Sequence, residues 1–411
     1  MKILHLAHQY PPEFTGGTEF YTQQLCQQLR LLGHETAVFY RRPGQGLAER
    51  VDPDGTRVWG AGAGPMTPLR RFRATFGQKS LLADWQGALA AYQPDLIHVQ
   101  HLMGLPAELL AASSVPYLIT FHDYWWVCAN AQLLTNYDQT ICAGPDHFIN
   151  CGRCALARGG AGALQLGAPL IAPLLARRNQ TLATILQNAA ARIAPTEFVR
   201  GRYQALGVTA PIELIRHGID YPRDLPAARR QPGPLQLVYL GSIAPQKGLH
   251  VAIAAVNELP PDAVRFTLYG GLTDFPDYVA ELRRLARHPG IEFAGRLTRQ
   301  QVWERLPQAD AALLPTQWFE ASPLTIDEMF VAGLPVIGSH IGALPDKIVP
   351  EVDGLLVAPA DVAAWVAALR RLLDEPELLP RLRAGIRPVR HIDDHVQEIV
   401  ALYEKVLAGG Q

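Results

Sequence analysis

The chain has 411 residues, more than the roughly 250–300 residues that one hydrophobic core usually serves, so we expect two domains. Its 37 Lys and Arg against 38 Asp and Glu leave no global basic field that would recruit nucleic acid. The longest charge-free apolar run, residues 159–176, contains two prolines and falls short of the roughly 20 residues that span a bilayer. The apolar run at the start is too short for a secretory leader, so we expect a cytoplasmic protein without a transmembrane helix.

Short apolar segments alternate with helical patterns, and this order runs through the chain twice. Segments that are apolar throughout, rather than at every second residue, indicate parallel strands covered by helices on both faces. The pattern therefore predicts an α/β fold with two parallel sheets. The segments are residues 2–7, 36–40, 95–100, 116–122, 191–196 and 212–218 in the first run, and 235–241, 264–270, 291–295, 311–316 and 334–339 in the second.

A proline-rich, arginine-rich segment, residues 221–236, separates the two runs and is interpreted as the interdomain linker. We expect an N-terminal Rossmann-like domain over residues 1–220, with a cysteine-rich insertion at about 125–180. A second Rossmann-like domain is expected over 235–390. Apolar residues at helical spacing predict a closing helix over 391–411 that lies at the interdomain region.

Ligands of open parallel sheets bind beyond the carboxyl ends of the strands. After the first strand, Gly16 and Gly17 precede a predicted helix and could let backbone amides approach a phosphate, although a flexible turn explains them equally well. After residues 116–121, His122 could donate a hydrogen bond to a hydroxyl or phosphate, and Asp123 could orient a loop or the imidazole. The alternative is a structural histidine.

In the second run, Lys247 follows a strand and precedes a helix, which suits a diphosphate leaving group, although a solvated lysine is the alternative. In the segment after residues 311–316, Ser322 is a candidate N-cap and Pro323 a candidate first helical residue. Glu320 then lies in a loop and Glu328 within the helix. The two carboxylates could accept hydrogen bonds at opposite ends of one elongated ligand.

Four of the five cysteines are clustered, with 13, 8 and 2 residues between them, ending in C-x2-C. This spacing suits a structural tetrathiolate zinc site, and free thiols or disulfides are the alternatives. Cys26, on a predicted helix, is interpreted as core. The clustered cysteines are Cys128, Cys142, Cys151 and Cys154.

Cations interleave with apolar residues twice in the first run. Residues 69–76 carry Arg70, Arg71 and Arg73, and the apolar run 159–176 precedes Arg177 and Arg178. Such segments could lie on an anionic membrane, where lipid-linked acceptors reside, or form a buried helical hairpin with a solvated basic rim.

The segments "TGGTE", "DLIHVQH", "TFHDYW", "APTEFV" and "GSIAPQKG" follow one another in the order and spacing of a known family. Together with a Glu, seven residues, a second Glu and "AGLPVIGS", the chain resembles the family 4 retaining glycosyltransferases of the two-domain GT-B fold. Its cysteines resemble an insertion found in a subgroup of that family. The resemblance implies transfer of a sugar from a nucleotide-diphosphate donor to an acceptor, such as a lipid-linked saccharide or other glycan, without a catalytic metal.

The resemblance also implies roles for the residues singled out above. Glu320 would contact the sugar hydroxyls, Glu328 the ribose hydroxyls and Lys247 the diphosphate. Gly16 and Gly17 would cover the diphosphate from the first domain, and His122 would reach the sugar. The backbone from Ala321 through Ser322, Pro323 and Leu324 to Thr325 would face sugar and phosphate.

The chain departs from the family at Ser242, where an arginine is usual, and Arg296 is a candidate replacement for that cation. Two alternatives to a transferase stay open at this stage. One is a nucleotide-sugar epimerase of the same fold. The other is a non-catalytic nucleotide-sugar-binding protein. We expect a peripheral contact with the inner face of the membrane only if the acceptor is lipid-linked.

Overall fold

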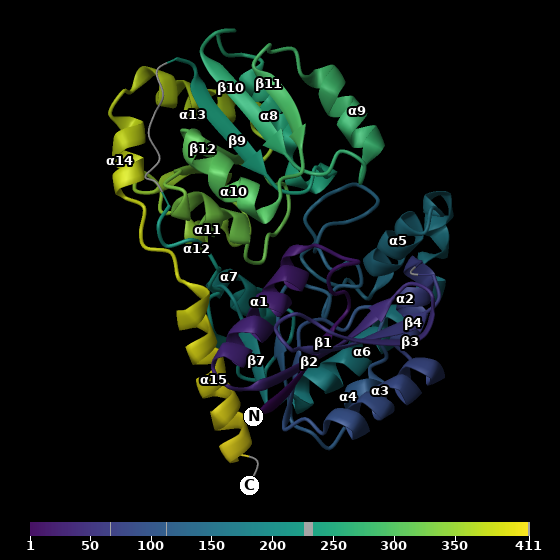
Figure 1. Cartoon of the computed structure of the whole chain (residues 1–411). Coiled ribbons are helices and arrows are strands. Elements are labelled where there is room, and N and C mark those ends of the chain that lie inside the picture. The colour runs from purple at the N-terminus through teal and green to yellow at the C-terminus, as the bar shows by residue number, and fades with distance from the viewer. Residues whose placement is uncertain (66, 112, 226–232, 410–411) are drawn as a thin grey trace. The chain divides into compact units, whose positions relative to one another are not determined.

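The computed structural model describes residues 1–65, 67–111, 113–225 and 233–409 (Figure 1). The chain divides into two compact units, the first formed by residues 1–220 together with 391–411 and the second by residues 221–390. Each unit is a twisted sheet flanked by helices. Within the described residues, every helix is too short or too polar to cross a membrane.

An eight-stranded sheet organises the first unit, in the order β3-β4-β2-β1-β5-β6-β7-β8. All neighbours are parallel except β3 and β4, which form an antiparallel edge. The central strands are buried on both faces, which explains why their sequences are apolar throughout. The strands are β1 (Lys2–Ala7), β2 (Glu35–Arg42), β3 (Gln45–Val51), β4 (Arg57–Ala63), β5 (Leu96–Val99), β6 (Tyr117–Thr120), β7 (Ala191–Ala194) and β8 (Glu213–Leu214).

Helices of the first unit connect successive strands and cover the sheet. The Thr196 hydroxyl caps the helix after β7 by accepting from the backbone N–H of Val199. The helices are α1 (Gly17–Leu31), α2 (Pro68–Ala74), α3 (Lys79–Tyr92), α4 (Glu108–Ala111), α5 (Ile149–Arg158), the 3₁₀ helix η1 (Gly162–Gly167), α6 (Ala168–Asn188), α7 (Glu197–Ala205) and, from the end of the chain, α15 (Ile392–Gly409).

Six strands, all parallel, form the second sheet, in the order β11-β10-β9-β12-β13-β14. The strands are β9 (Leu235–Leu240), β10 (Val264–Tyr269), β11 (Ile291–Gly295), β12 (Ala311–Leu314), β13 (Val336–Ser339) and β14 (Gly354–Val357). The helices are η2 (Pro245–Lys247), α8 (Leu249–Val256), α9 (Pro276–Leu285), α10 (Arg299–Arg305), η3 (Leu306–Gln308), α11 (Leu324–Val331), α12 (Leu344–Lys347), α13 (Val362–Asp374) and α14 (Leu378–Ala384).

The predicted α/β fold with two parallel sheets is confirmed, but three strands were not predicted from the sequence. β3 is exposed along most of its length, β4 contains two glycines and two alanines, and β14 has only four residues. None of these carries the buried β-branched pattern that marks a strand in a sequence. The predicted linker 221–236 overlaps β9 at its end, and its residues 226–232 lie outside the described residues.

The last helix, α15, completes the core of the first unit (Figure 1). Its residues Val396, Ile399 and Tyr403 are buried in one cluster with apolar residues of α1, including Leu25. The Tyr403 hydroxyl lies 2.6 Å from Nδ1 of His98, a buried residue of β5. Packing and a buried hydrogen bond therefore tie the end of the chain to its first half.

We expect Ile399→Ala to lower the free energy of unfolding by about 2–5 kcal/mol, because it opens a cavity in a fully buried cluster. Denaturant unfolding of the full chain measures this loss, and Gln397→Ala, an exposed position on the same helix, serves as the control with a change within about 0.5 kcal/mol. Equal effects of the two substitutions would contradict the packing of α15.

Candidate functional site

An ion pair joins the ends of two neighbouring strands in the second unit. Lys247, in η2 after β9, places Nζ 2.6 Å from Oε1 of Glu320, which follows β12. The same carboxylate oxygen accepts from Nε1 of Trp318 at 2.8 Å and from the hydroxyl of Thr316 at 3.2 Å. Three donors thus converge on Oε1. The structure brings together the two residues that the sequence analysis placed at sugar and diphosphate.

Close backbone packing fixes this pair. Gly248 has φ +69°, and a Cβ there would collide with the carbonyl oxygen of Pro315. The backbone N–H of Gln317 donates to the carbonyl of Gln246 at 2.8 Å. These contacts hold the loop after β9 against the loop after β12, which keeps the backbones of Lys247 and Glu320 close to each other.

Helix α11 begins one residue later than predicted. Pro323 is the N-cap rather than the first helical residue, and no side chain caps the helix, so the prediction of Ser322 as N-cap is wrong. The Ser322 hydroxyl is buried and has no hydrogen-bond partner among the described residues. A helix N-terminus without a protein cap presents backbone N–H groups that can bind an anion. The stretch from Ala321 to Thr325 forms this terminus.

Glu328 lies inside α11 and forms an ion pair with Arg299, the first residue of α10. Burial raises the pKa of Glu328, and the neighbouring Arg299 opposes this shift. The guanidinium also lies over the ring of Trp303, 4.7 Å from its centroid. Arg299 therefore holds the side chain of Glu328 on α11, whereas Glu320 lies in the loop before that helix.

Two positions bear on a second cation at the diphosphate: Ser242, where the family usually has an arginine, and Arg296, the candidate replacement. Both residues are exposed. Ser242 follows β9, and its carbonyl accepts from the hydroxyl of Tyr239 at 2.8 Å. Arg296 donates to Asp274 at 2.5 Å, so a carboxylate already balances its charge. The structure does not pair Arg296 with Lys247 or Glu320 in the described part of the chain.

In the first unit, Gly16 is the N-cap of α1 and Gly17 its first residue. A Cβ at Gly16 would collide with the carboxylate of Glu19, which is buried beneath the helix start. Burial raises the pKa of Glu19, and its Oε1 lies 3.6 Å from Nε2 of His8 after β1. The glycine pair thus lies beside an acid and an imidazole that the sequence analysis did not single out.

His122 follows β6 and is neutral. Burial, together with nearby His101, lowers the pKa of His122 to about 3. Its Nε2 lies 2.8 Å from Oε1 of Gln100, an acceptor, so Nε2 carries the proton and Nδ1 is the acceptor atom. Of the two roles predicted for Asp123, the structure supports orientation of a loop, because Oδ1 accepts from the backbone N–H of Trp125 at 2.8 Å. The imidazole that Asp123 meets is that of His101, whose Nε2 lies 3.0 Å from Oδ2, and not that of His122.

An aromatic cluster surrounds His122 and includes residues far apart in the sequence. The Tyr21 ring from α1 lies 5.0 Å from His122 and 4.6 Å from His217, and the two imidazoles are stacked at 5.4 Å. The Tyr21 hydroxyl lies 2.8 Å from Nε2 of His395 on α15. The closing helix therefore supports the surroundings of His122.

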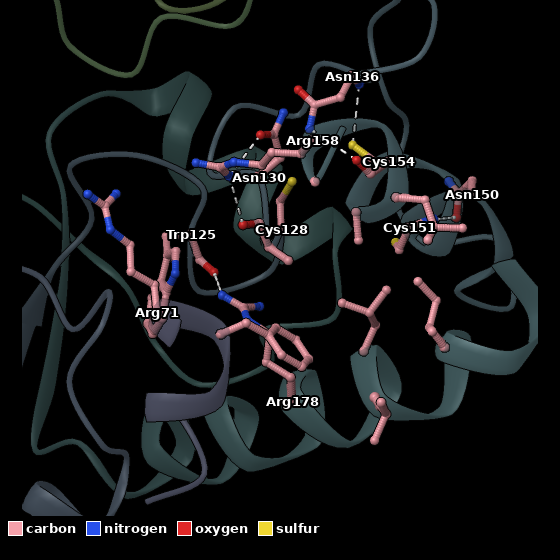
Figure 2. Close-up of a pocket in the computed structure, with 18 of the residues that line it drawn as sticks. Arg71, Trp125, Cys128, Asn130, Asn136, Asn150, Cys151, Cys154, Arg158 and Arg178 are labelled. Carbon is pink, nitrogen blue, oxygen red and sulfur yellow. Dashed lines mark hydrogen bonds between the residues drawn. The ribbon is translucent and has the colours of Figure 1, made fainter. Parts of the chain in front are cut away.

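The four clustered cysteines line one cavity, in which Cys128, Cys151 and Cys154 are labelled in Figure 2. All are free thiols, and burial raises the pKa of Cys151 to about 12 and that of Cys154 to about 11. Within the described residues, no three His, Cys, Asp or Glu side chains group closely enough to hold a metal. The predicted zinc site has no support in this arrangement. Cys26 is buried in the core, as predicted.

Several site residues escaped the sequence reading. The capping box that Thr298 and Gln301 form could have placed Arg299 at the start of α10. It gave no sign that this start lies beside Glu328. Tyr21 and His395 gave no local signal, because their neighbours come from opposite ends of the chain.

The chain matches two known protein families. The family described as "Glycosyltransferase Family 4" matches residues 15–223, half of the chain, and "Glycosyl transferases group 1" matches residues 234–375. Glycogen synthase of Mycobacterium tuberculosis is 29% identical over 398 residues, covering 94% of this chain and 89% of that protein. D-inositol 3-phosphate glycosyltransferase of Kineococcus radiotolerans is 24% identical, covering 91% and 86%.

Solved structures share the fold at low identity. Sucrose-phosphate synthase from Thermosynechococcus elongatus superimposes with a TM-score of 0.75 at 19% identity and covers all of both chains. Anabaena Alr3699/HepE in complex with UDP and glucose has a TM-score of 0.66 at 18% identity, covering 98% of this chain and 100% of its own. With both sheets and both family matches in the same order along the sequence, the chain belongs to the family 4 glycosyltransferases and has their GT-B fold.

Proposed function

We propose that the protein transfers a sugar from a nucleotide-diphosphate donor to an acceptor with retention of the anomeric configuration. The observation that carries this proposal is the Lys247–Glu320 pair beside the uncapped N-terminus of α11. A cation and helix-terminal amides next to a hydrogen-bonded carboxylate suit a ligand that joins an anion to a polyhydroxyl group. The complex of Anabaena HepE with UDP and glucose supports the same class of ligand.

In this proposal, the second unit binds the donor along the line from Glu328 to Glu320. Glu328, held by Arg299, accepts from the ribose hydroxyls, and Oε2 of Glu320 accepts from a sugar hydroxyl. Lys247 and the backbone N–H groups of Ala321, Ser322, Leu324 and Thr325 face the diphosphate. The buried Ser322 hydroxyl, which has no partner in the described part of the chain, gains a phosphate oxygen as acceptor.

Cleavage of the bond between sugar and diphosphate places negative charge on the leaving phosphate and positive character on the sugar carbon. Lys247 and the helix amides are already oriented before the reaction, so they stabilise this charge with little reorganisation. These groups can perform the task without a divalent cation. Neutral His122 can accept a hydrogen bond from a hydroxyl at Nδ1 without adding charge beside the sugar carbon.

Gly16 and Gly17 complete the proposal in the first unit. As the N-cap and first residue of α1, they offer backbone amides that could approach the diphosphate. In this proposal, the acceptor is a glycan or a lipid-linked saccharide. Arg296 is the candidate for a second cation near the phosphates after displacement of Asp274. Ser242 contributes no charge.

The direct test is a thermal-shift screen of the full chain against UDP, GDP, ADP and their common sugar conjugates, followed by product analysis. A ligand at about 100 times its dissociation constant adds roughly 2.7 kcal/mol of apparent stability. Transfer to an added acceptor, with an anomeric proton signal that shows retention, supports the proposal. Sugar interconversion without an acceptor would indicate an epimerase, and binding without turnover would indicate a non-catalytic protein.

Replacing Lys247 by Met should lower kcat for transfer about 100- to 1000-fold, because the variant keeps the apolar stem and removes the charge at the leaving phosphate. Arg296→Ala should have a smaller effect, since Asp274 already balances that charge. Lys405→Ala, an exposed lysine on α15, is the control. Steady-state kinetics with a saturating donor measure all three, and an unchanged kcat in Lys247→Met would refute its role.

Glu328→Ala should weaken binding of the ribonucleotide about tenfold or more, because it removes hydrogen bonds to a charged acceptor. The native protein should bind a 2′-deoxynucleotide more weakly than the ribonucleotide, and this preference should disappear in the variant. Calorimetric titration of both nucleotides measures the cycle, with Glu304→Ala on the neighbouring helix as the control. If the variant keeps its full preference for the ribonucleotide, Glu328 does not read the ribose.

The lowered pKa of His122 gives a pH prediction. An unfolded histidine binds a proton below about 6.5, whereas folded His122 stays neutral down to about 3. The free energy of unfolding therefore falls as pH drops below 6.5, by up to about 1.4 kcal/mol per pH unit for this one group. Unfolding measured from pH 7.5 to 4.5 should show a shallower acid loss in His122→Gln than in the native protein. An unchanged slope would mean that His122 is protonated in the fold.

A further inference from the structure

The cavity that the four cysteines line has a volume of about 420 Å³ and lies in the first unit (Figure 2). Its lining contains none of the residues proposed above to bind the donor. It is enclosed by α2, the segment after β6, α5 and α6. Its wall is largely apolar, with Phe72 from α2, Leu134 from the segment after β6, and Leu175 from α6. A cavity of this size and composition is suited to an apolar ligand with a few fixed polar contacts.

Three arginines line the cavity, and its lining contains no Asp or Glu. Arg178 is 1% exposed, and it donates to the Trp125 carbonyl at 2.5 Å and to Oδ1 of Asn179 at 2.8 Å. Arg158 donates to Oδ1 of Asn130 at 3.0 Å. Both bind neutral acceptors, so their charges are not neutralised by these bonds.

Arg71 lacks even a neutral side-chain partner. Its Nε is buried without a hydrogen bond, and its guanidinium forms no ion pair with the described residues. Burial lowers the pKa of Arg71, and the charge of Arg158 lowers it further. Both side chains line the same cavity. Arg71 is half-buried and Arg158 is exposed. An anion seated against this wall would gain charge-assisted hydrogen bonds from both guanidinium groups.

The surface beside the cavity is apolar and basic. Leu174 lines the cavity and is 49% exposed, and Leu166 and Leu170 nearby are almost fully exposed. The sequence from 147 to 196 contains five arginines and no Asp or Glu. A single long apolar ligand could pass from this surface into the cavity without meeting a negative charge.

The cavity also adjoins the polar strand ends of the first unit. Trp125, a wall residue, donates its backbone N–H to Oδ1 of Asp123 at 2.8 Å. Met103, another wall residue, donates its backbone N–H to Nδ1 of His101 at 3.0 Å. These two bonds join the wall of the cavity to polar residues at the strand ends.

We propose that this cavity binds a phosphate-bearing lipid, with the apolar chain against Phe72, Leu134 and Leu175 and the phosphate at Arg71 and Arg158. A phosphate monoester carries about −1.5 to −2 at pH 7, which matches several unneutralised guanidinium groups better than one carboxylate does. That such a lipid carries the acceptor rests on the proposed transferase function. Binding of the lipid does not.

The test uses the full chain and four probes: dodecyl phosphate, dodecanol, dodecyltrimethylammonium and inorganic phosphate. Calorimetry should show saturable binding of dodecyl phosphate, at least tenfold tighter than that of each other probe. Arg71→Gln should weaken it about tenfold, because a bond between two charged groups is lost. Arg73→Gln, an exposed neighbour on α2 outside the lining, should change it less than twofold.

A second variant guards against misfolding of the first. Ala155→Trp fills the cavity from α5 and should abolish binding of dodecyl phosphate while the nucleotide-induced thermal shift is retained. Equal binding of dodecyl phosphate and dodecyltrimethylammonium would reduce the cavity to a non-specific apolar site and overturn the proposal. So would binding of phospholipid vesicles without binding of dodecyl phosphate, which would indicate docking on a bilayer.

Metal analysis gives an independent outcome. Stoichiometric zinc, lost when Cys151 and Cys154 are replaced by Ser, would supply thiolates beside the arginines and overturn the cavity as an anion site. The nucleotide screen reports separately on the transferase. Its failure leaves lipid binding measurable, and the failure of lipid binding leaves donor binding untouched.

Discussion

Buried parallel strands impose one constraint from which the rest of this structure follows. Strands that are covered on both faces carry few polar side chains along their length, so most polar groups of the site lie where the strands end. In the second sheet, the ends of β9 and β12 bring Lys247 and Glu320 to 2.6 Å. In the first sheet, the ends of β5 and β6 bring His101 and Asp123 together.

The fold could be predicted from the sequence because its signals are local, whereas the contact between Lys247 and Glu320 joins residues 73 positions apart and was not predicted. Uniformly apolar strands mark a parallel sheet, and the Glu320 to Glu328 segment keeps a recognisable spacing. The pairing of Asp123 could not be read correctly. It follows His122 in sequence, but its partner, His101, comes from the neighbouring strand, and only the register of β5 and β6 decides which imidazole it meets.

Long-range contacts account for the remaining errors. Arg299 meets Glu328 across 29 residues, and Tyr21 meets His395 across 374, distances at which no periodic pattern reports proximity. The start of α11 shifted by one residue because Pro323 can serve as N-cap as well as first helical residue, and sequence alone does not separate the two. Within the described residues, the cysteines line one cavity but do not group closely enough to hold the predicted metal, because their positions relative to one another depend on how α5 packs against α6.

The burial of α15 in the first unit affects the order in which the protein can fold during synthesis. Its apolar residues fill a core that starts with β1 and α1, yet the ribosome makes the whole second unit, residues 221–390, before it makes α15. Until then, the side chains of Leu25 and His98 lack the partners that bury them. The second unit can mature first, while the first unit waits for the last twenty or so residues and exposes an apolar face that chaperones could recognise.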